Sequence, residues 1–186
     1  MDTKNLNDFY QNYKLILTYM DLKSTVQRNT ELMLNRRGCV VIFNHHDDYV
    51  VAQNNDNYYL TYFIWNVKCT IDGIRNIIAV AKNLDKNITN IIIIHAKSLT
   101  PDARCFVSIT SKFFFELFYV HEMEYDLIEI IQNIAPHELL NDKPKEWKKY
   151  PCLLANTDRV CRYYNFKKDD IIKITENGVI TYRRVV

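Results

Sequence analysis

The chain is poor in glycine, with only 3 glycines among 186 residues. A phosphate-binding loop of the P-loop or Rossmann type needs several glycines, because its backbone N–H groups must approach the phosphate closely. The scarcity of glycine therefore disfavours nucleotide binding of either type. Nothing else in the sequence suggests a cofactor, and we expect none.

The 5 cysteines form neither a disulfide framework nor a zinc motif. Their number is odd, no two have C-x-x-C spacing, and most lie in apolar or aromatic runs, as is typical of buried thiols in a cytosolic or nuclear protein. No apolar run approaches the ~18–20 residues of a membrane helix. Residues 1–5 are polar and do not resemble a signal peptide. We therefore expect no membrane partner.

Hydrophobic residues are plentiful, at 48% of the chain, and there are 13 tyrosines, which together exclude global disorder. The net charge of +2 is unevenly distributed. Residues 1–135 carry 13 Lys and Arg against 15 Asp and Glu, whereas residues 136–186 carry 11 against 7. The basic C-terminal part favours a polyanion or an acidic protein face as its partner.

The pattern of apolar residues predicts an α/β (α+β) protein with an N-terminal domain over residues 1–133. Helical spacing covers the first forty residues, with a break expected at residues 23–25 and Gly38 after the last helical turn. We expect strands at residues 39–43 and 58–67, separated by a turn at residues 54–57. A helix over residues 70–84, a strand at 91–94, a helix starting at Thr100 and a strand at 113–119 follow. This β-β-α-β-α-β succession predicts a mixed sheet flanked by helices.

A small second domain is predicted over residues 134–186, because three of the four prolines lie within sixteen residues at its beginning. A short helix is expected near residues 146–150 and another at 158–166. Two strands, at residues 171–175 and 179–185, flank Glu176, Asn177 and Gly178, which form the strongest hairpin signal in the chain.

The helix that starts at Thr100 is the best candidate for a binding site. Thr100 suits the N-cap position and Pro101 the first helical position, and a helix N-terminus attracts phosphate. Lys97, Ser98 and Arg104 surround this turn, and each can donate a hydrogen bond to phosphate oxygens. From the residues alone, an ordinary capped surface helix is the alternative.

Three groups of residues have the composition of a catalytic or metal site. Residues 45–48 are His-His-Asp-Asp. Consecutive residues of a strand point to opposite faces, so two such histidines rarely bind the same ion, and we expect a polar loop here rather than a metal site. Glu122, Glu124, Asp126 and Glu129 are explained as a solvated face. Cys161, Cys152 and His137 could supply a nucleophile and a base, but only their residue types suggest it. We expect no metal site and no catalytic residues.

The α/β layout also resembles the restriction-endonuclease fold, whose metal site needs an aspartate and then Glu-x-Lys on the next strand. Asp47 or Asp48 could supply the aspartate, but the strand has Asn66-Val67-Lys68. Asparagine is a poor substitute for a carboxylate at a divalent metal. The sequence therefore disfavours an active nuclease.

Two passages resemble a known family. One is the apolar strand at residues 88–94 followed by Lys-Ser-Leu-Thr-Pro-Asp-Ala at 97–103. The other is Val-Cys-Arg-Tyr-Tyr at 160–164, followed by Ile-Thr-Tyr-Arg at 180–183. Their order and separation resemble the fifth subunit shared by the nuclear RNA polymerases. This chain differs from that family's pattern in having Asp102 within the Thr-Pro turn and a tight Glu176-Asn177-Gly178 turn before the last strand.

The resemblance implies a non-catalytic polymerase subunit whose active site lies in other chains. Residues 1–133 would be a jaw domain that contacts downstream duplex DNA, without sequence specificity, through Lys97, Ser98, Thr100, Pro101 and Arg104. Residues 134–186 would be an assembly domain, similar to the small archaeal RNA polymerase protein that lacks a jaw, and would bind the largest polymerase subunit. The residues expected at that interface are Arg162, Tyr163, Tyr164, Tyr182, Arg183 and Arg184.

The implied location is the nucleus for a cellular protein, and the virion or a cytoplasmic viral factory for a viral one. Two other hypotheses stay open. The chain could be a stand-alone DNA-binding protein with a defunct nuclease-like domain, or an adaptor that binds only proteins.

Overall fold

The computed structural model describes residues 3–45, 48–84 and 87–186, and the side chains of these residues except for 3–17, 133 and 134. Its contacts divide the chain into two compact units, Met1–Tyr125 and Asp126–Val186. The expected mixed α/β fold is confirmed. The division lies at residue 125, whereas the sequence suggested residue 133, so one further helix belongs to the C-terminal unit.

The N-terminal unit contains a mixed sheet of five strands among the described residues, in the order β1-β2-β3-β4-β5. The strands are β1 (Val40–His45), β2 (Tyr49–Asn54), β3 (Asn57–Lys68), β4 (Ile88–Lys97) and β5 (Phe114–Tyr119). Strand β2 is antiparallel to both of its neighbours, β1 and β3. Strands β3, β4 and β5 run parallel, because a helix crosses over between each pair.

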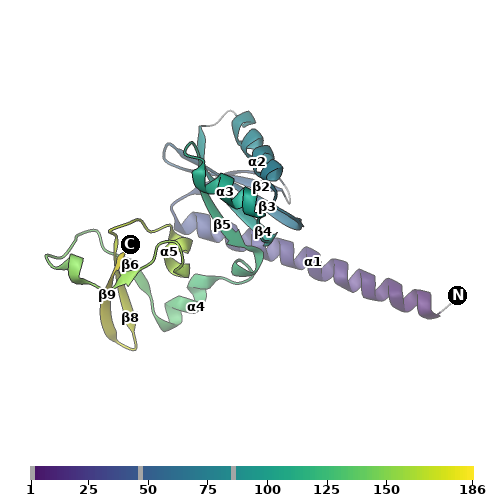
Figure 1. The fold of residues 1–186 in the computed structure, drawn as a ribbon. Helices are drawn as coiled ribbons and strands as arrows, with labels where there is room; N and C mark the ends of the chain where they lie inside the picture. Colours follow the sequence, from purple (N-terminus) through teal and green to yellow (C-terminus); the bar gives the residue numbers. More distant parts are fainter. Residues whose placement is uncertain (1–2, 46–47, 85–86) are drawn as a thin grey trace. The chain divides into compact units, whose positions relative to one another are not determined.

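Helices cover both faces of this sheet (Figure 1). The crossover helices α2 (Ile71–Asn83) and α3 (Pro101–Ile109) lie on one face, where Ile74, Ile77 and Ala103 join the buried residues of β3 and β4. The long helix α1 (Thr3–Arg36) packs on the other face, which carries Glu116. A bidentate ion pair between Arg37, directly after α1, and Glu116 of β5 ties this helix to the sheet.

One prediction about the N-terminal unit was wrong, and one strand was missed. Helix α1 continues through residues 23–25 without a break, because the Ser24 hydroxyl donates to the carbonyl of Asp21 within the helix rather than ending it. Strand β2 was not predicted, although Val50, Val51 and Ala52 are buried in it. The expected turn at residues 54–57 is the β2–β3 hairpin, in which Asn55 has a positive φ of 51°.

The C-terminal unit contains four strands, among the described residues, in the order β6-β8-β9-β7. Its elements are α4 (Leu127–Ile134), β6 (His137–Leu139), the 3-10 helix η2 (Trp147–Lys149), β7 (Cys152–Leu153), α5 (Arg159–Tyr164), β8 (Ile171–Glu176) and β9 (Val179–Val185). Cys161 of α5 packs against Ile172 and Val185 on one face of the sheet. On the other face Tyr150 stacks on Tyr182.

The predicted hairpin turn is confirmed: Asn177 and Gly178 both have positive φ, at 49° and 79°, as a tight two-residue turn between twisted strands requires. The two short strands β6 and β7 were not predicted. Among the described residues, no helix combines the length and hydropathy that a membrane crossing requires.

Candidate nucleic-acid interface

The starts of α2 and α3 lie side by side at one edge of the sheet, because both helices follow parallel strands that end there. Each start is capped by a threonine. The Thr70 hydroxyl oxygen accepts a hydrogen bond from the Gly73 N–H at 3.2 Å, and that of Thr100 accepts from the Ala103 N–H at 3.3 Å. The Thr100 N–H donates to the carbonyl of Cys69 at 3.0 Å, which ties the two turns together. The predicted cap and the position of Pro101 are confirmed.

Exposed basic side chains surround these two turns. Lys97 at the end of β4 is the register partner of Lys68 at the end of β3, and both are exposed. Arg104 is exposed in the first turn of α3. The Ser98 hydroxyl lies 3.2 Å from the Tyr119 hydroxyl. This edge therefore presents three cations and several hydroxyl groups.

The α3 start offers fewer free peptide donors than a bare helix N-terminus. Pro101 has no N–H, and the N–H groups of Ala103 and Arg104 bond to the side chain and carbonyl of Thr100. Among the described contacts, the Asp102 N–H is left for a ligand. The Thr100 hydroxyl accepts from the helix but can still donate its proton. Phosphate binding here would therefore depend mainly on side chains.

Lys68 and Thr70 are the residues that sequence reasoning missed at this edge. Thr70-Ile71-Asp72 has the same capping pattern as Thr100-Pro101-Asp102, a signal that could have identified it. Lys68 comes beside Lys97 only through the register of β3 and β4, which the sequence does not reveal. Two carboxylates oppose the cations here. Asp102 is exposed, and Asp72 pairs with Arg75 at 2.9 Å.

A hollow of about 510 Å³ lies beside the same edge, between the end of β3 and the first turns of α2. Trp65 and Val67 line it together with Lys68, Thr70 and Asp72. It combines an apolar wall with charged groups of both signs. Burial raises the pKa of the nearby Cys69 thiol to about 11, so this side chain stays protonated at neutral pH.

The second group of predicted site residues does not form one surface. On α5, Arg162 and Tyr164 are partly exposed, but Tyr163 is only 4% exposed. The alternation of β9 places Tyr182 and Arg184 on one face of the sheet and Arg183 on the other. A binding surface on this unit therefore excludes Tyr163 and cannot use both faces of β9 at once.

Arg184 is occupied within the chain. Its guanidinium lies 5.9 Å from the centre of the Trp147 ring, donates to the Cys152 sulfur at 3.5 Å and lies 3.8 Å from the Asp169 carboxylate. These contacts hold the segment around Trp147 against β9. The prediction that Arg184 contacts a partner competes with this structural role.

Three of the residues considered for catalysis make contacts within the chain or are buried. Glu122 accepts a hydrogen bond from the Tyr119 N–H, and Asp126 caps α4 by accepting from the Ile128 N–H. Burial, assisted by Asp158, raises the pKa of Cys161 to about 12, which keeps its thiol protonated. The described residues contain no group of three or more His, Cys, Asp or Glu side chains that could hold a metal ion.

Among the residues that the structure describes, the nuclease-type site lacks its second carboxylate. The Phe63 N–H donates to the Asp48 carbonyl at 2.8 Å, which places Asp48 beside Phe63 on β3. The residues of β3 next to Phe63 are Tyr62 and Ile64, and neither has a carboxylate. The Asp48 carboxylate pairs instead with the His45 ring at 3.3 Å. Asn66 lies further along β3 and is exposed. His46 and Asp47, which were also considered, lie outside the described residues.

Comparison with protein-family models gives no match to this sequence, and comparison with curated proteins gives none either.

Proposed function

We propose that this chain is a non-catalytic subunit of a multisubunit DNA-dependent RNA polymerase. In this proposal the C-terminal unit anchors the chain on the largest polymerase subunit, and the N-terminal unit holds downstream duplex DNA in the cleft. The magnesium and the catalytic residues would belong to the other subunits.

One observation carries the proposal. The turn at residues 97–104, for which the family resemblance implies DNA contact, lies at an exposed sheet edge where Lys68, Lys97 and Arg104 gather around two capped helix starts. Side-chain contacts to phosphate carry no sequence information. That property suits a subunit that must move along any template.

The DNA contact is tested by the charge reversals Lys97→Glu and Arg104→Glu, made together in the tagged subunit of an assembled polymerase. The matched control is Lys82→Glu with Lys112→Glu, two exposed lysines away from this edge. We expect elongation complexes that contain Lys97→Glu and Arg104→Glu to dissociate at a lower salt concentration. A plot of the logarithm of the DNA-binding constant against the logarithm of the salt concentration should also become shallower by about 2, which is about 1 for each lost phosphate contact.

Equal salt stability of both double variants would contradict the DNA contact and favour a protein-only adaptor. Tight, salt-sensitive binding of duplex DNA by the free chain, together with a failure to enter the polymerase, would favour the stand-alone DNA-binding protein. The nuclease-like alternative would then explain the fold of the N-terminal unit.

A further inference from the structure

Three cations surround the Trp147 ring in the C-terminal unit. The Lys143 Nζ lies 4.9 Å and the Lys148 Nζ 5.7 Å from the centre of this ring, and the Arg184 guanidinium lies 5.9 Å from it. A lysine beside an aromatic ring keeps its charge and can still donate hydrogen bonds to a ligand. Like charges that are held this close repel one another, and an anion that binds among them relieves the repulsion.

Residues 142–150, hereafter the Trp147 segment, carry four lysines and two carboxylates. Glu146 pairs with Lys149 at 2.8 Å. Lys143 and Lys148 are exposed, and neither forms an ion pair among the described residues. The segment therefore keeps an excess of positive charge, and the two lysines beside the ring are available to an anion.

Contacts with β9 hold the Trp147 segment in place. Tyr150 stacks on Tyr182 of β9, with the ring centres 5.5 Å apart. The Arg184 N–H of the same strand donates to the Pro151 carbonyl, directly after the segment, at 2.9 Å. The Arg184 guanidinium lies 3.8 Å from the Asp169 carboxylate, so it positions the ring rather than binding a ligand. The site is thus pre-organised, and less conformational entropy is lost when a ligand binds.

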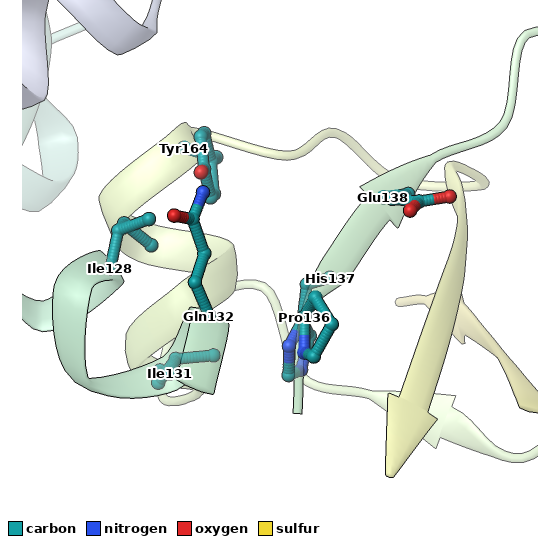
Figure 2. Close-up of a pocket in the computed structure, with 7 residues that line it drawn as sticks. All are labelled: Ile128, Ile131, Gln132, Pro136, His137, Glu138 and Tyr164. Atoms are coloured by element: carbon teal, nitrogen blue, oxygen red, sulfur yellow. The ribbon is translucent and has the colours of Figure 1, made fainter. Parts of the chain in front are cut away.

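The pocket of this unit offers no such cations. It has a volume of about 340 Å³ and lies between α4, α5 and the start of β6 (Figure 2). Among the described residues, no lysine or arginine lines it. Its carboxylate, that of Glu138, pairs with Lys173 of β8 at 2.9 Å. A polyanion that binds the C-terminal unit is therefore drawn to the Trp147 segment rather than to this pocket.

The aromatic side chains beside the lysines indicate the class of anion. Trp147, Tyr150 and Tyr182 are all partly exposed. Proteins that bind single-stranded nucleic acid combine cations, which contact the phosphates, with aromatic rings on which the bases stack. An acidic peptide would satisfy the lysines but has no flat rings for the aromatic side chains. In a duplex the bases are already stacked on one another, so a single strand fits this surface best.

We propose that the Trp147 segment binds single-stranded nucleic acid. Lys143 and Lys148 contact phosphates of the strand, and its bases stack against the exposed parts of Trp147 and Tyr150. Contacts of this kind tolerate any base sequence. The proposal does not rest on the polymerase assignment, and it concerns a different unit from the proposed duplex contact.

The test uses the full-length chain and measures fluorescence anisotropy with labelled oligo(dT), oligo(U) and duplex DNA of equal length. The test variant combines Lys143→Glu with Lys148→Glu. The matched control combines Lys82→Glu with Lys112→Glu, at two exposed lysines of the N-terminal unit, and changes the net charge by the same amount. Circular dichroism verifies that each variant is folded.

We expect the test variant to bind single strands at least about tenfold more weakly than the unmodified chain. The control should bind them within about twofold at physiological ionic strength, which screens distant charges. For the test variant, the plot of the logarithm of the binding constant against the logarithm of the salt concentration should become shallower by about 1.4, which is about 0.7 for each lost phosphate contact. Tighter binding of oligo(U) identifies the strand as RNA, and tighter binding of oligo(dT) identifies it as DNA; both results support the proposal.

Tryptophan fluorescence reports on the site itself. The chain has 2 tryptophans, so Trp65→Phe leaves Trp147 as the single source of this emission. A base that stacks on Trp147 quenches the emission, and we expect oligo(dT) to quench it with the same Kd as the anisotropy gives. If Trp65→Phe does not fold, the anisotropy of the lysine variants still decides the result.

Equal binding of single strands by the unmodified chain and the test variant would overturn the proposal. Tighter binding of a glutamate peptide of equal charge than of either oligonucleotide would also overturn it, because the occupant would be an acidic protein. Loss of single-strand binding in Lys97→Glu with Arg104→Glu, but not in the test variant, would place the contact in the N-terminal unit. The polymerase proposal is tested through Lys97 and Arg104, so a failure here is distinct from a failure there.

Discussion

At the scale of single residues, the ion pair between Arg37 and Glu116 is a bidentate and largely buried polar contact of the N-terminal unit. Both guanidinium N–H groups reach the carboxylate, at 2.9 and 2.8 Å, and the side chains are only 4% and 11% exposed. The guanidinium also lies over the Phe118 ring. A buried pair of this kind fixes the geometry between α1 and β5, and it is costly to break on one side.

We expect Glu116→Gln to lower the free energy of unfolding by about 3–5 kcal/mol, because it removes the charged carboxylate to which the buried Arg37 guanidinium donates two hydrogen bonds. Asp72→Asn removes the exposed pair with Arg75 and should cost no more than about 1 kcal/mol. Urea denaturation of both variants measures the difference. Equal costs would show that the Arg37–Glu116 pair is solvated and contributes little.

The buried thiol of Cys161 predicts a loss of stability in alkali. Its pKa is raised from 9.0 to about 12, chiefly by burial. Above about pH 9 the unfolded chain releases this proton and the folded chain keeps it, so the unfolded state becomes favoured as the pH rises, by up to ~1.4 kcal/mol per pH unit. Cys69, with a pKa of about 11, acts in the same direction.

Urea denaturation from about pH 8 to about pH 11 tests this linkage. The free energy of unfolding of Cys161→Ala should start lower, because the substitution leaves a cavity, but it should fall less steeply with pH than that of the unmodified chain. Tyrosine and lysine groups titrate equally in both proteins. Parallel pH profiles would therefore mean that Cys161 is accessible to solvent and ionises normally.

The candidate DNA site shows which parts of a site can be predicted from sequence. The cap at Thr100 follows from a local pattern of residue types, and the structure confirms it. Lys68 and Lys97 meet through pairing between strands almost thirty residues apart, which no local pattern encodes. Arg184 was expected at a partner interface, but its contacts with Trp147 and Asp169 depend on how η2 and the segment before β8 pack against β9.

At the scale of elements, two glycines have opposite roles. Gly178 has a φ of 79° in the β8–β9 turn, and an added Cβ would meet nothing within 4 Å. The cost of a side chain there comes from the backbone alone. Gly73 lies inside α2, where an added Cβ would be 3.7 Å from the Thr70 hydroxyl oxygen and 3.8 Å from the Cys69 sulfur, both ordinary contacts.

We therefore expect Gly178→Ala to destabilise the chain by about 1 kcal/mol and Gly73→Ala to stabilise it by up to about 1 kcal/mol. Thermal denaturation of the two variants should shift the Tm in opposite directions. A loss of stability in Gly73→Ala would mean that the first turn of α2 is too tightly packed for a methyl group.

The errors in the sequence-based fold have a common physical cause. A break in α1 was expected at residues 23–25, but Val26, Met33 and Leu34 are fully buried, and this burial outweighs the low helix propensity of Ser24 and Thr25. The missed strands β6 and β7 have three and two residues. Strands this short have no periodicity of their own and exist only because β8 and β9 offer partners.

At the scale of the whole molecule, the chain consists of two units with different surfaces. In the N-terminal unit, the parallel strands and capped helices gather cations at one edge of the sheet. The C-terminal unit combines an acidic region at α4 and β6 with a basic remainder. A polymerase subunit needs separate surfaces for DNA and for protein, and this division of charge is consistent with the proposed function.

The most direct measurement is affinity purification of the tagged chain from its native source, followed by mass spectrometry of the proteins that stay bound in high salt. High salt weakens contacts between exposed charges but not a packed interface. The account predicts the two largest polymerase subunits in amounts near that of the tagged chain. Recovery of the chain alone, or with proteins unrelated to transcription, would contradict it.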